Sequence, residues 1–446
     1  MMTDNKQVKE TPIDRLSSLP DSIIIHILSF LQVKHSAVTA VLSTRWRYLW
    51  PETPILIFRE KSSCPETTRN FVTRTHRTLV LCGRNGLETF EIEFSYSNVH
   101  SLDVDVWVDF VVRNKVKQVS LLLNSSPSSQ LDFYLLPQMI FRNSFLKRLI
   151  LRRCDVSPRR AIEWRSLTEL LIGLVELQQH VIENILSGCP VLNRLYLLDC
   201  WGFNRLEVES KCLYELRVSD RDDGVNEPVL RISAPYVNTL WVSRYVEERK
   251  LSLGNVSSLA KATIDLDGSC WNTATEEVMN NAKELLEKTR HAKAVESRCG
   301  YTEVLSAMAM CGYQFPQSAR KYLLVRPRAE KAQIHGIAGL LESSPNLEAL
   351  FIEGEDLFKE PRVCPDPKAD LDRDLLHLKT ITIKDFIDPN LVGEPMLTLA
   401  RILLKKAPAL EKMVVNIRVD VNEPVKIAQT LLSYPRSSKE AVVLLN

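Results

Sequence analysis

The residues in this chain with the chemistry for catalysis or metal binding are scattered rather than grouped. The ten cysteines include no Cys-x-x-Cys pair, and none of the eight histidines stands at helical spacing from a second histidine or a cysteine. Structural zinc sites usually contain such closely spaced ligand pairs. The sequence also lacks the motifs of phosphate-binding loops, dinucleotide-binding folds, metalloproteases and nucleophile elbows. We therefore expect no catalytic residue, no metal and no cofactor, although an acid–base pair that assembles only in space leaves no such pattern.

The composition is that of a folded protein larger than one ordinary core. The chain has 446 residues, of which 45% are hydrophobic and 25% charged, so we expect two or three domains or one elongated repeat array. The net charge of +2 provides no global attraction for nucleic acid or an acidic membrane. The polar residues 1–10 indicate no secretory signal, and no apolar run is long enough to span a bilayer. Scattered cysteines without such a signal indicate reduced thiols, in the cytosol or the nucleus.

Residues 14–50 predict three short helices that carry more apolar side chains than so small a unit can bury. Pro20 and Asp21 mark the start of the first helix, residues 33–36 interrupt the pattern, and Ser43 is the expected N-cap of the third helix. The apolar positions at helical spacing are Ile24, Ile27, Leu28 and Leu31, then Ala37, Val38, Val41 and Leu42, then Trp46, Leu49 and Trp50. Some of them must meet either the rest of the chain or the helices of a partner.

Three parts of this unit resemble the F-box of the large plant family of F-box proteins with leucine-rich repeats and an FBD module. The Leu-Pro-Asp start lies at 19–21, the Ile-Leu-Ser-Phe-Leu middle at 27–31, and the Leu-Ser-x-Arg-Trp-x-x-Leu-Trp end at 42–50; Thr39 departs from a common Arg. The resemblance implies docking on a Skp-type adaptor and, through it, a cullin. The adaptor contacts it implies are Leu19, Pro20, Ile24, Ile27, Leu28 and Leu31. The alternative for each is plain core packing.

Nucleic acid is not among the expected partners. Arg45 and Arg47 flank Trp46, a residue of core type, but a groove-reading helix needs several basic side chains on one face together with groups that reach base edges. The expected partners are the adaptor, the cullin behind it and an unknown protein substrate, with no membrane.

An apolar-x-x-apolar-x-apolar pattern recurs along most of the remaining chain. Clear examples are Leu146/Leu149/Leu151, Leu167/Leu170/Ile172, Leu192/Leu195/Leu197, Leu213/Leu216/Val218, Val237/Leu240/Val242 and Leu347/Leu350/Ile352. The starts are mostly roughly 21 to 32 residues apart, close to the leucine-rich-repeat range of about 20–29. The last two apolar residues point to one side of a short strand. Because one unit cannot bury this side alone, we predict stacked units with a parallel sheet along one face.

Between several of these units the chain reads as a helix followed by proline. Helices expected over 180–186, 334–341 and 397–406 each precede a proline that turns the chain into the next strand. Residues 265–340 are less regular, with a helix expected over 275–294 and degenerate units near Ala292 and Ala319. Asn124, Cys154 and Cys200 fall three residues after strands, where we expect their side chains to satisfy backbone groups.

Residues 378–438 resemble the FBD module in three stretches, 378–383, 403–413 and 434–438. The module's usual Pro-rich entry with a Cys-Leu pair is missing, and 364–367 stands loosely in its place, so its first strand stays open. The predicted fold is α/β: a three-helix F-box at 14–54, a leucine-rich-repeat solenoid at 80–355, and an FBD module at 366–440 that continues the solenoid. In the solenoid we expect parallel strands on the concave face and helices on the convex face.

The exposed middle residue of each strand lines the concave face of a solenoid. In the predicted register these residues are Ile150, Leu171, Tyr196, Arg217, Trp241, Thr263, Phe351 and Thr382. Four of them are of types enriched at binding interfaces, so the predicted substrate contacts are Tyr196, Arg217, Trp241 and Phe351. The alternative is that loops cover these side chains or that they cap the core.

The predicted function is that of the substrate-recognition subunit of a Skp-cullin-F-box ubiquitin ligase. The F-box binds the adaptor, and the repeats hold a protein substrate for ubiquitination and degradation by an enzyme elsewhere in the complex. The alternative is a leucine-rich-repeat scaffold, without a ubiquitin role, whose N-terminal helices merely cap the array. The two differ in whether Leu19, Pro20 and the Ile27/Leu28 face are accessible or buried inside the chain. A third possibility, an enzyme, requires a polar pocket that the sequence does not indicate.

Overall fold

The computed structural model describes residues 16, 18–82, 86–125, 132–220, 229–245, 250–267, 275–327, 333–354, 371–386, 394–417 and 424–445. The chain divides into two compact units, Met1–Cys154 and Asp155–Asn446.

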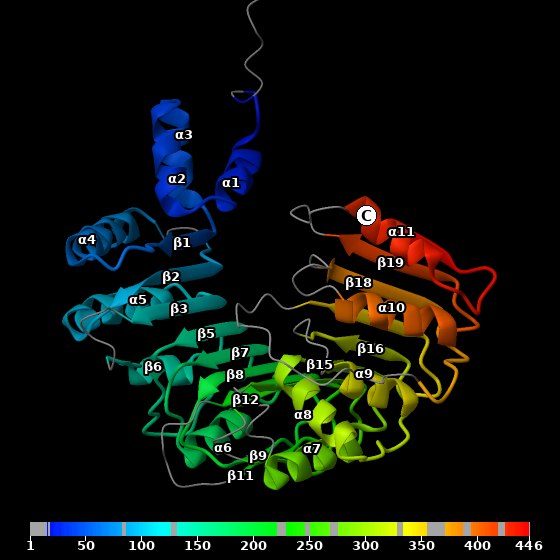
Figure 1. Ribbon diagram of the computed structural model, residues 1–446. Helices are drawn as coiled ribbons and strands as arrows, with labels where there is room; N and C mark the ends of the chain where they lie inside the picture. Colours follow the sequence, from blue (N-terminus) through cyan, green and yellow to red (C-terminus); the bar gives the residue numbers. More distant parts are fainter. Residues whose placement is uncertain are drawn as a thin grey trace, which may run out of the picture. The chain divides into compact units, whose positions relative to one another are not determined.

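The first unit opens with the predicted helical segment (Figure 1). Its elements are α1 (Asp21–Ser29), α2 (Val33–Val38), the 3-10 turn η1 (Thr39–Val41), α3 (Thr44–Leu49) and η2 (Trp50–Glu52). Ser43 caps α3 as predicted, because its hydroxyl accepts a hydrogen bond from the Trp46 N–H at 3.4 Å. The expected interruption at 33–36 is wrong, since α2 begins at Val33 and that side chain is buried.

A parallel sheet follows directly on these helices in the first unit. The elements are β1 (Ile55–Arg59), α4 (Pro65–Leu81), β2 (Thr89–Tyr96), η3 (Asn98–His100), α5 (Ser101–Arg113), β3 (Gln118–Ser125), β4 (Tyr134–Leu135), η4 (Gln138–Arg142) and β5 (Arg148–Arg152), with β6 (Cys154–Asp155) at the boundary of the unit. The strands pair in the order β1-β2-β3-β5. The sheet therefore starts at Ile55, before residue 80, where the repeat region was predicted to begin. β1 alternates partly exposed and buried residues, but it lacks the leucine spacing on which the prediction depended.

Aromatic side chains fill the space between this sheet and its helices. Phe94 on β2 stacks on Phe71 of α4 at 5.6 Å between ring centroids and meets Trp107 of α5 edge-on, also at 5.6 Å. All three side chains are buried, and edge-on or offset ring pairs add stabilisation beyond the area that they bury. This cluster fixes α4 against the sheet, and α4 later forms one wall of a cavity.

In the second unit, too, each strand of the main sheet is followed by a segment that leads the chain back to the next parallel strand (Figure 1). Its strands are β7 (Glu169–Gly173), β8 (Arg194–Cys200), β9 (Arg205–Glu207), β10 (Glu215–Asp220), β11 (Val229–Ser233), β12 (Thr239–Tyr245), β13 (Lys250–Leu253), β14 (Lys261–Asp267), β15 (Ala294–Ser297), β16 (Tyr322–Val325), β17 (Ala349–Glu353), β18 (Thr380–Phe386), β19 (Lys412–Ile417) and β20 (Val442–Leu445). Its helices are α6 (Gln179–Gly188), α7 (Glu276–Thr289), α8 (Cys299–Met310), α9 (Gln333–Glu342), α10 (Glu394–Lys406) and α11 (Pro424–Ser433).

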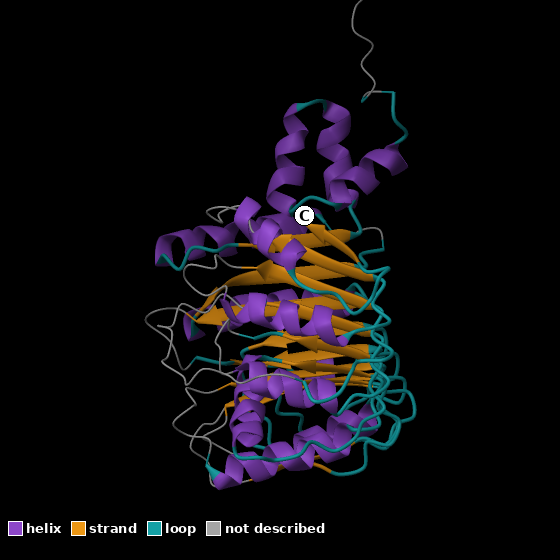
Figure 2. Ribbon diagram, turned by 45° about the vertical axis from the view of Figure 1, so that its right-hand side comes forward, coloured by secondary structure: helices purple, strands orange, loops and turns teal. Residues whose placement is uncertain are grey.

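The main sheet of this unit is parallel throughout and has the predicted register. Its order is β7-β8-β10-β12-β14-β15-β16-β17-β18-β19-β20, a single ladder of strands (Figure 2). Leu195 and Leu197 are buried, and Tyr196 between them is partly exposed. The same alternation in neighbouring strands gives one apolar side that faces the core and one row of middle residues on the opposite face.

Three of the returning segments are strands rather than helices. β9, β11 and β13 pair in parallel as a second, three-stranded sheet. The expectation of helices between strands is therefore too simple for residues 201–255. In β11, Leu230 and Ile232 are buried and Arg231 is exposed, a two-residue alternation that suits a half-buried strand and not a helix.

The helices predicted from proline spacing are present as α6, α9 and α10, and strands β15 and β16 follow Ala292 and Ala319. The helix expected over 275–294 ends earlier, at Thr289. The region 378–438 contains β18, α10, β19 and α11, which continue the sheet, while 364–367 lies outside the described residues. The assignment of an FBD module to 366–440 stays a prediction.

Helices α8 and α9 cross at small residues, and the crossing allows a stability test. A Cβ atom at Gly336 of α9 would lie 2.5 Å from Ser306 Oγ and 2.8 Å from the Thr302 carbonyl oxygen of α8. We expect Gly336→Ala to lower the free energy of unfolding by about 1–3 kcal/mol, despite the greater helix propensity of alanine. Urea unfolding of the full chain measures this change. Unchanged stability would show that the two helices can separate here at no cost.

Candidate functional site

The three N-terminal helices of the first unit are tied together by a small number of polar contacts. The Arg45 guanidinium of α3 donates a hydrogen bond to Asp21 Oδ1 at 2.7 Å and another to the Leu19 carbonyl oxygen at 2.6 Å. The Ser36 hydroxyl of α2 donates to the Leu28 carbonyl oxygen at 3.1 Å. These contacts hold the start and the end of α1 against the other two helices. The Arg45 contacts give the arginine of the Arg-Trp motif a structural role.

Packing of these helices leaves an unusual amount of apolar surface in water. We define the F-box apolar face as the exposed large apolar side chains of residues 16–48: Leu16, Ile23, Ile27, Phe30, Val38, Val41, Leu42 and Tyr48. Val41 is 82% exposed, Phe30 74% and Tyr48 73%. Apolar residues concentrated in this way on a small unit mark a surface for a partner.

The six predicted adaptor contacts differ in how far they are exposed to solvent. Pro20 and Ile27 are exposed, and Leu19 and Leu31 are half-buried. Ile24 and Leu28 have 0% and 1% of their surface exposed, so in this conformation they support the face and cannot touch a partner. This corrects the expectation for these two, because the inner positions of α1 pack against the other helices. Phe30, Val41 and Tyr48 are highly exposed but were not among the predicted adaptor contacts. The spacing of Val38, Val41 and Leu42 had indicated a second apolar face.

A second candidate surface lies on the sheet of the second unit. Arg217 on β10 is aligned with Tyr196 on β8 and with Trp241 on β12, so three of the four predicted substrate contacts are direct neighbours. The Arg217 guanidinium lies 5.0 Å from the centre of the Tyr196 ring and 2.7 Å from Glu215 Oε1. We call these three residues the aromatic–arginine row.

Glu215 links two members of this row. The Tyr196 hydroxyl donates a hydrogen bond to Glu215 Oε2 at 3.1 Å, while the other carboxylate oxygen binds Arg217. Burial raises the pKa of Tyr196, and the hydrogen bond to Glu215 raises it further. The Glu215 carboxylate thus holds the Tyr196 hydroxyl and the Arg217 guanidinium side by side.

Phe351, the fourth predicted contact, lies elsewhere on the same face. The register passes from Trp241 through Thr263, Glu296 and Leu324 before it reaches Phe351. Phe351 is 39% exposed, but Thr263 is only 4% exposed. The expectation that Thr263 lines the surface is therefore wrong: the side chain is covered, and its hydroxyl donates a hydrogen bond to Glu296 Oε2 at 3.2 Å.

Charged side chains connect the strands that separate Phe351 from the aromatic–arginine row. Arg326 on the loop after β16 lies 3.0 Å from Glu296 of β15 and 3.0 Å from Glu353 of β17. Arg298 pairs with Asp265 of β14 at 3.1 Å. Because the partners are about one repeat apart in the sequence, local patterns do not reveal them. Within these ion pairs the opposite charges neutralise each other. This part of the face therefore presents less unpaired charge to a substrate.

Two of the three predicted turn residues, Cys154 and Cys200, contact backbone groups as expected, whereas the Asn124 side-chain amide donates a hydrogen bond to the Glu93 carboxylate at 3.5 Å. Cys200 Sγ lies 3.4 Å from the Ile172 carbonyl oxygen, and Cys154 Sγ lies 3.5 Å from the Arg152 carbonyl oxygen. Among the described residues, no cluster of three or more His, Cys, Asp or Glu side chains could hold a metal ion. No helix in the described ranges is long and apolar enough to cross a membrane.

Fold and surface together define a class: an F-box followed by a leucine-rich-repeat solenoid. A family model described as "At1g61320/AtMIF1, LRR domain" matches residues 82–440, and the F-box domain model matches residues 16–57. The chain belongs to the plant family of F-box/LRR-repeat proteins with this type of repeat domain. The repeat model covers both the predicted solenoid and the predicted FBD segment. This architecture is typical of non-catalytic adaptor proteins.

The chain is similar to several curated proteins from Arabidopsis thaliana. F-box/LRR-repeat protein At3g03360 is 27% identical over 97% of this chain and 90% of its own length. F-box/LRR-repeat protein At5g02910 is 29% identical over 76% of this chain and 72% of its own length. F-box protein At5g03100 is 28% identical over 68% of this chain and 95% of its own length.

Proposed function

We propose that this protein is the substrate-recognition subunit of a Skp-cullin-F-box ubiquitin ligase. The F-box apolar face binds the Skp-type adaptor, which links the chain to a cullin. The solenoid holds a protein substrate, and no residue of this chain takes part in a covalent step. The contribution to the reaction is proximity, because a held substrate presents its lysines to the transferring enzyme at high effective concentration.

The observation that carries the proposal is the exposure of the F-box apolar face. A scaffold whose N-terminal helices only cap the array would bury these side chains against its own first repeat. Instead, Val41, Phe30 and Tyr48 are each more than 70% exposed, while the inner side of α1 is packed. Apolar contact area of this kind is what a helical partner needs for a stable complex.

The test is co-expression of the full chain with a Skp-type adaptor, followed by size-exclusion chromatography. A complex with one copy of each chain supports the proposal. A folded chain that stays free of the adaptor at micromolar concentration of both proteins would favour the scaffold alternative.

The aromatic–arginine row is the proposed centre of the substrate surface. We expect Tyr196→Ala/Trp241→Ala to reduce the amount of substrate bound or ubiquitinated by at least about tenfold, because central aromatic residues dominate binding energy. Quantitative mass spectrometry of proteins retained by the chain–adaptor complex measures the loss. Tyr322→Ala, an exposed aromatic on β16, is the matched control. If the double variant instead lowers the melting temperature markedly, the two side chains are packing residues.

A further inference from the structure

A cavity of about 510 Å³ lies within the first unit, between the F-box and the first repeat. One wall comes from α2 and η2 of the F-box, and the others come from β1, the two residues after it, and α4. Its volume falls in the range of about 300–1,000 Å³ that is usual for small-molecule sites. Neither adaptor binding nor the substrate surface gives this cavity a role.

The interior of the cavity is aromatic and firmly packed. Trp50 of η2, Phe58 of β1 and Phe71 of α4 all line it, and each is at most 8% exposed. Phe58 and Phe71 are held by further rings, since Phe58 lies 5.9 Å from Phe90, and Phe71 stacks on Phe94. Such fixed rings form a preformed surface for a flat apolar group.

The charged residues that line the cavity are nearly all basic. They are Lys34, Arg59, Lys61, Arg74 and Arg77, with Glu60 as the single acidic residue. Arg74 lies 3.6 Å from Glu60, and Arg59 is paired with Glu91 of β2 outside the cavity. Within the part of the chain that the structure describes, Lys34, Lys61 and Arg77 form no ion pair, so positive charge remains uncompensated at the rim.

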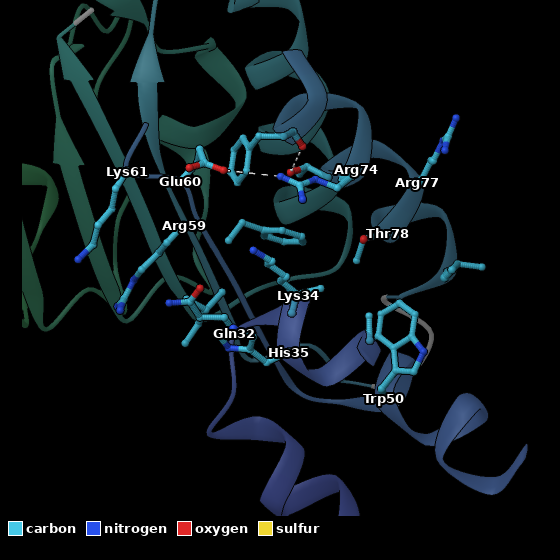
Figure 3. A pocket seen from close by; sticks show the side chains of 17 residues that line it. Gln32, Lys34, His35, Trp50, Arg59, Glu60, Lys61, Arg74, Arg77 and Thr78 are labelled. Carbon is cyan, nitrogen blue, oxygen red and sulfur yellow. Dashed lines mark hydrogen bonds and ion pairs between the residues drawn. The ribbon is translucent and has the colours of Figure 1, made fainter. Parts of the chain in front are cut away.

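The orientation of these side chains separates Lys34 from the others. In Figure 3 the Lys34 side chain reaches into the space between α2 and the strand, whereas Arg77 points away from the cavity and Arg74 turns to Glu60. Thr78, on the α4 wall opposite, adds a hydroxyl. The arrangement is an aromatic interior with one free ammonium group directed into it.

We propose that this cavity binds a small amphipathic organic anion, with a flat apolar body against the rings and an acidic group at Lys34. Lys34 is an exposed residue, and the attraction of its ammonium group favours an anion over a neutral molecule of the same shape. Because the walls belong to the F-box and to the first repeat, the bound anion joins the two and stabilises the first unit. The site does not use the F-box apolar face, so it stands whether or not the adaptor binds.

Isothermal titration calorimetry of the full chain with 2-naphthoate tests the proposal, with 2-naphthalenemethanol as the neutral match. We expect submillimolar binding of the naphthoate, and at least about tenfold weaker binding of the alcohol. Lys34→Glu should weaken naphthoate binding at least about tenfold, since attraction becomes repulsion. Lys261→Glu, an exposed lysine on β14, is the matched charge control and should leave binding unchanged.

A second variant fills the cavity from its other wall. Thr78→Met should also weaken binding by at least about tenfold, with circular dichroism and the melting temperature confirming that each variant is folded. The proposal is overturned if the folded wild-type chain binds no naphthoate, or if the alcohol binds equally well. It is also overturned if binding survives both Lys34→Glu and Thr78→Met, which would place the naphthoate on the F-box apolar face instead.

Discussion

Replacing Ile27 and Val41 together by glutamate is expected to abolish the complex with a Skp-type adaptor, with affinity falling by more than about 100-fold. Val41 is 82% exposed and Ile27 38% in the free chain, so both carboxylates can reach water in the folded chain, and circular dichroism checks that the variant is folded. In the complex, two ionised groups must either leave water without a partner or hold the surfaces apart. Either outcome removes the apolar contact on which the proposed interface depends. Surface plasmon resonance with immobilised adaptor measures the affinity of the full chain.

The matched control is Val99→Glu/Leu102→Glu, also in the first unit. Val99 is 82% exposed, as is Val41, and Leu102 is 76% exposed, so the control adds the same charge to apolar surface outside the F-box. We expect it to bind the adaptor with wild-type affinity. Equal loss in both variants would attribute the effect to charge in general. Retained binding by Ile27→Glu/Val41→Glu would show that the F-box apolar face is not the adaptor surface.

Leu28→Ala is expected to destabilise the F-box by about 2–5 kcal/mol, because it leaves a cavity where a fully buried side chain was packed. Leu28 is 1% exposed and lies inside the three-helix packing. Hydrogen exchange in peptides from residues 16–57, followed by mass spectrometry, should report the loss locally. Leu42→Ala removes the same number of atoms from a side chain that is 59% exposed, and its effect on exchange should be much smaller.

Adaptor titration distinguishes this destabilisation from the loss of a contact. In a destabilised F-box only the folded fraction of molecules binds the adaptor, and binding draws more molecules into the folded state. Excess adaptor should therefore saturate Leu28→Ala fully. Ile27→Glu/Val41→Glu should stay unbound over the same concentrations. If Leu28→Ala leaves hydrogen exchange unchanged and still abolishes binding, the side chain contacts the adaptor directly, and α1 rearranges in the complex.

Local patterns in the sequence were sufficient for the class of fold and for many of its elements, although they missed β1, β9, β11 and β13. The two-residue spacing of Leu195 and Leu197 fixes which side of β8 is buried, because side chains alternate along any strand. The cap at Ser43 and the helices that precede proline likewise depend on neighbouring residues alone. The F-box motif and the repeated apolar pattern together indicated the family, which the matches to both domain models confirm.

Only the tertiary structure decided which of these residues form surfaces. Periodicity places Ile24 and Ile27 on one stripe of a helix, but the depth of each depends on how α1 meets α2 and α3, and only Ile27 reaches water. Thr263 occupies a register position that was expected to be exposed, but it is buried and its hydroxyl is bonded to Glu296 from the next strand. The cavity beside Lys34 forms where segments about 40 residues apart come together. Contacts between residues so far apart in the sequence depend on how whole elements pack together. A single sequence indicates the periodicity of each element but not the geometry of packing between elements.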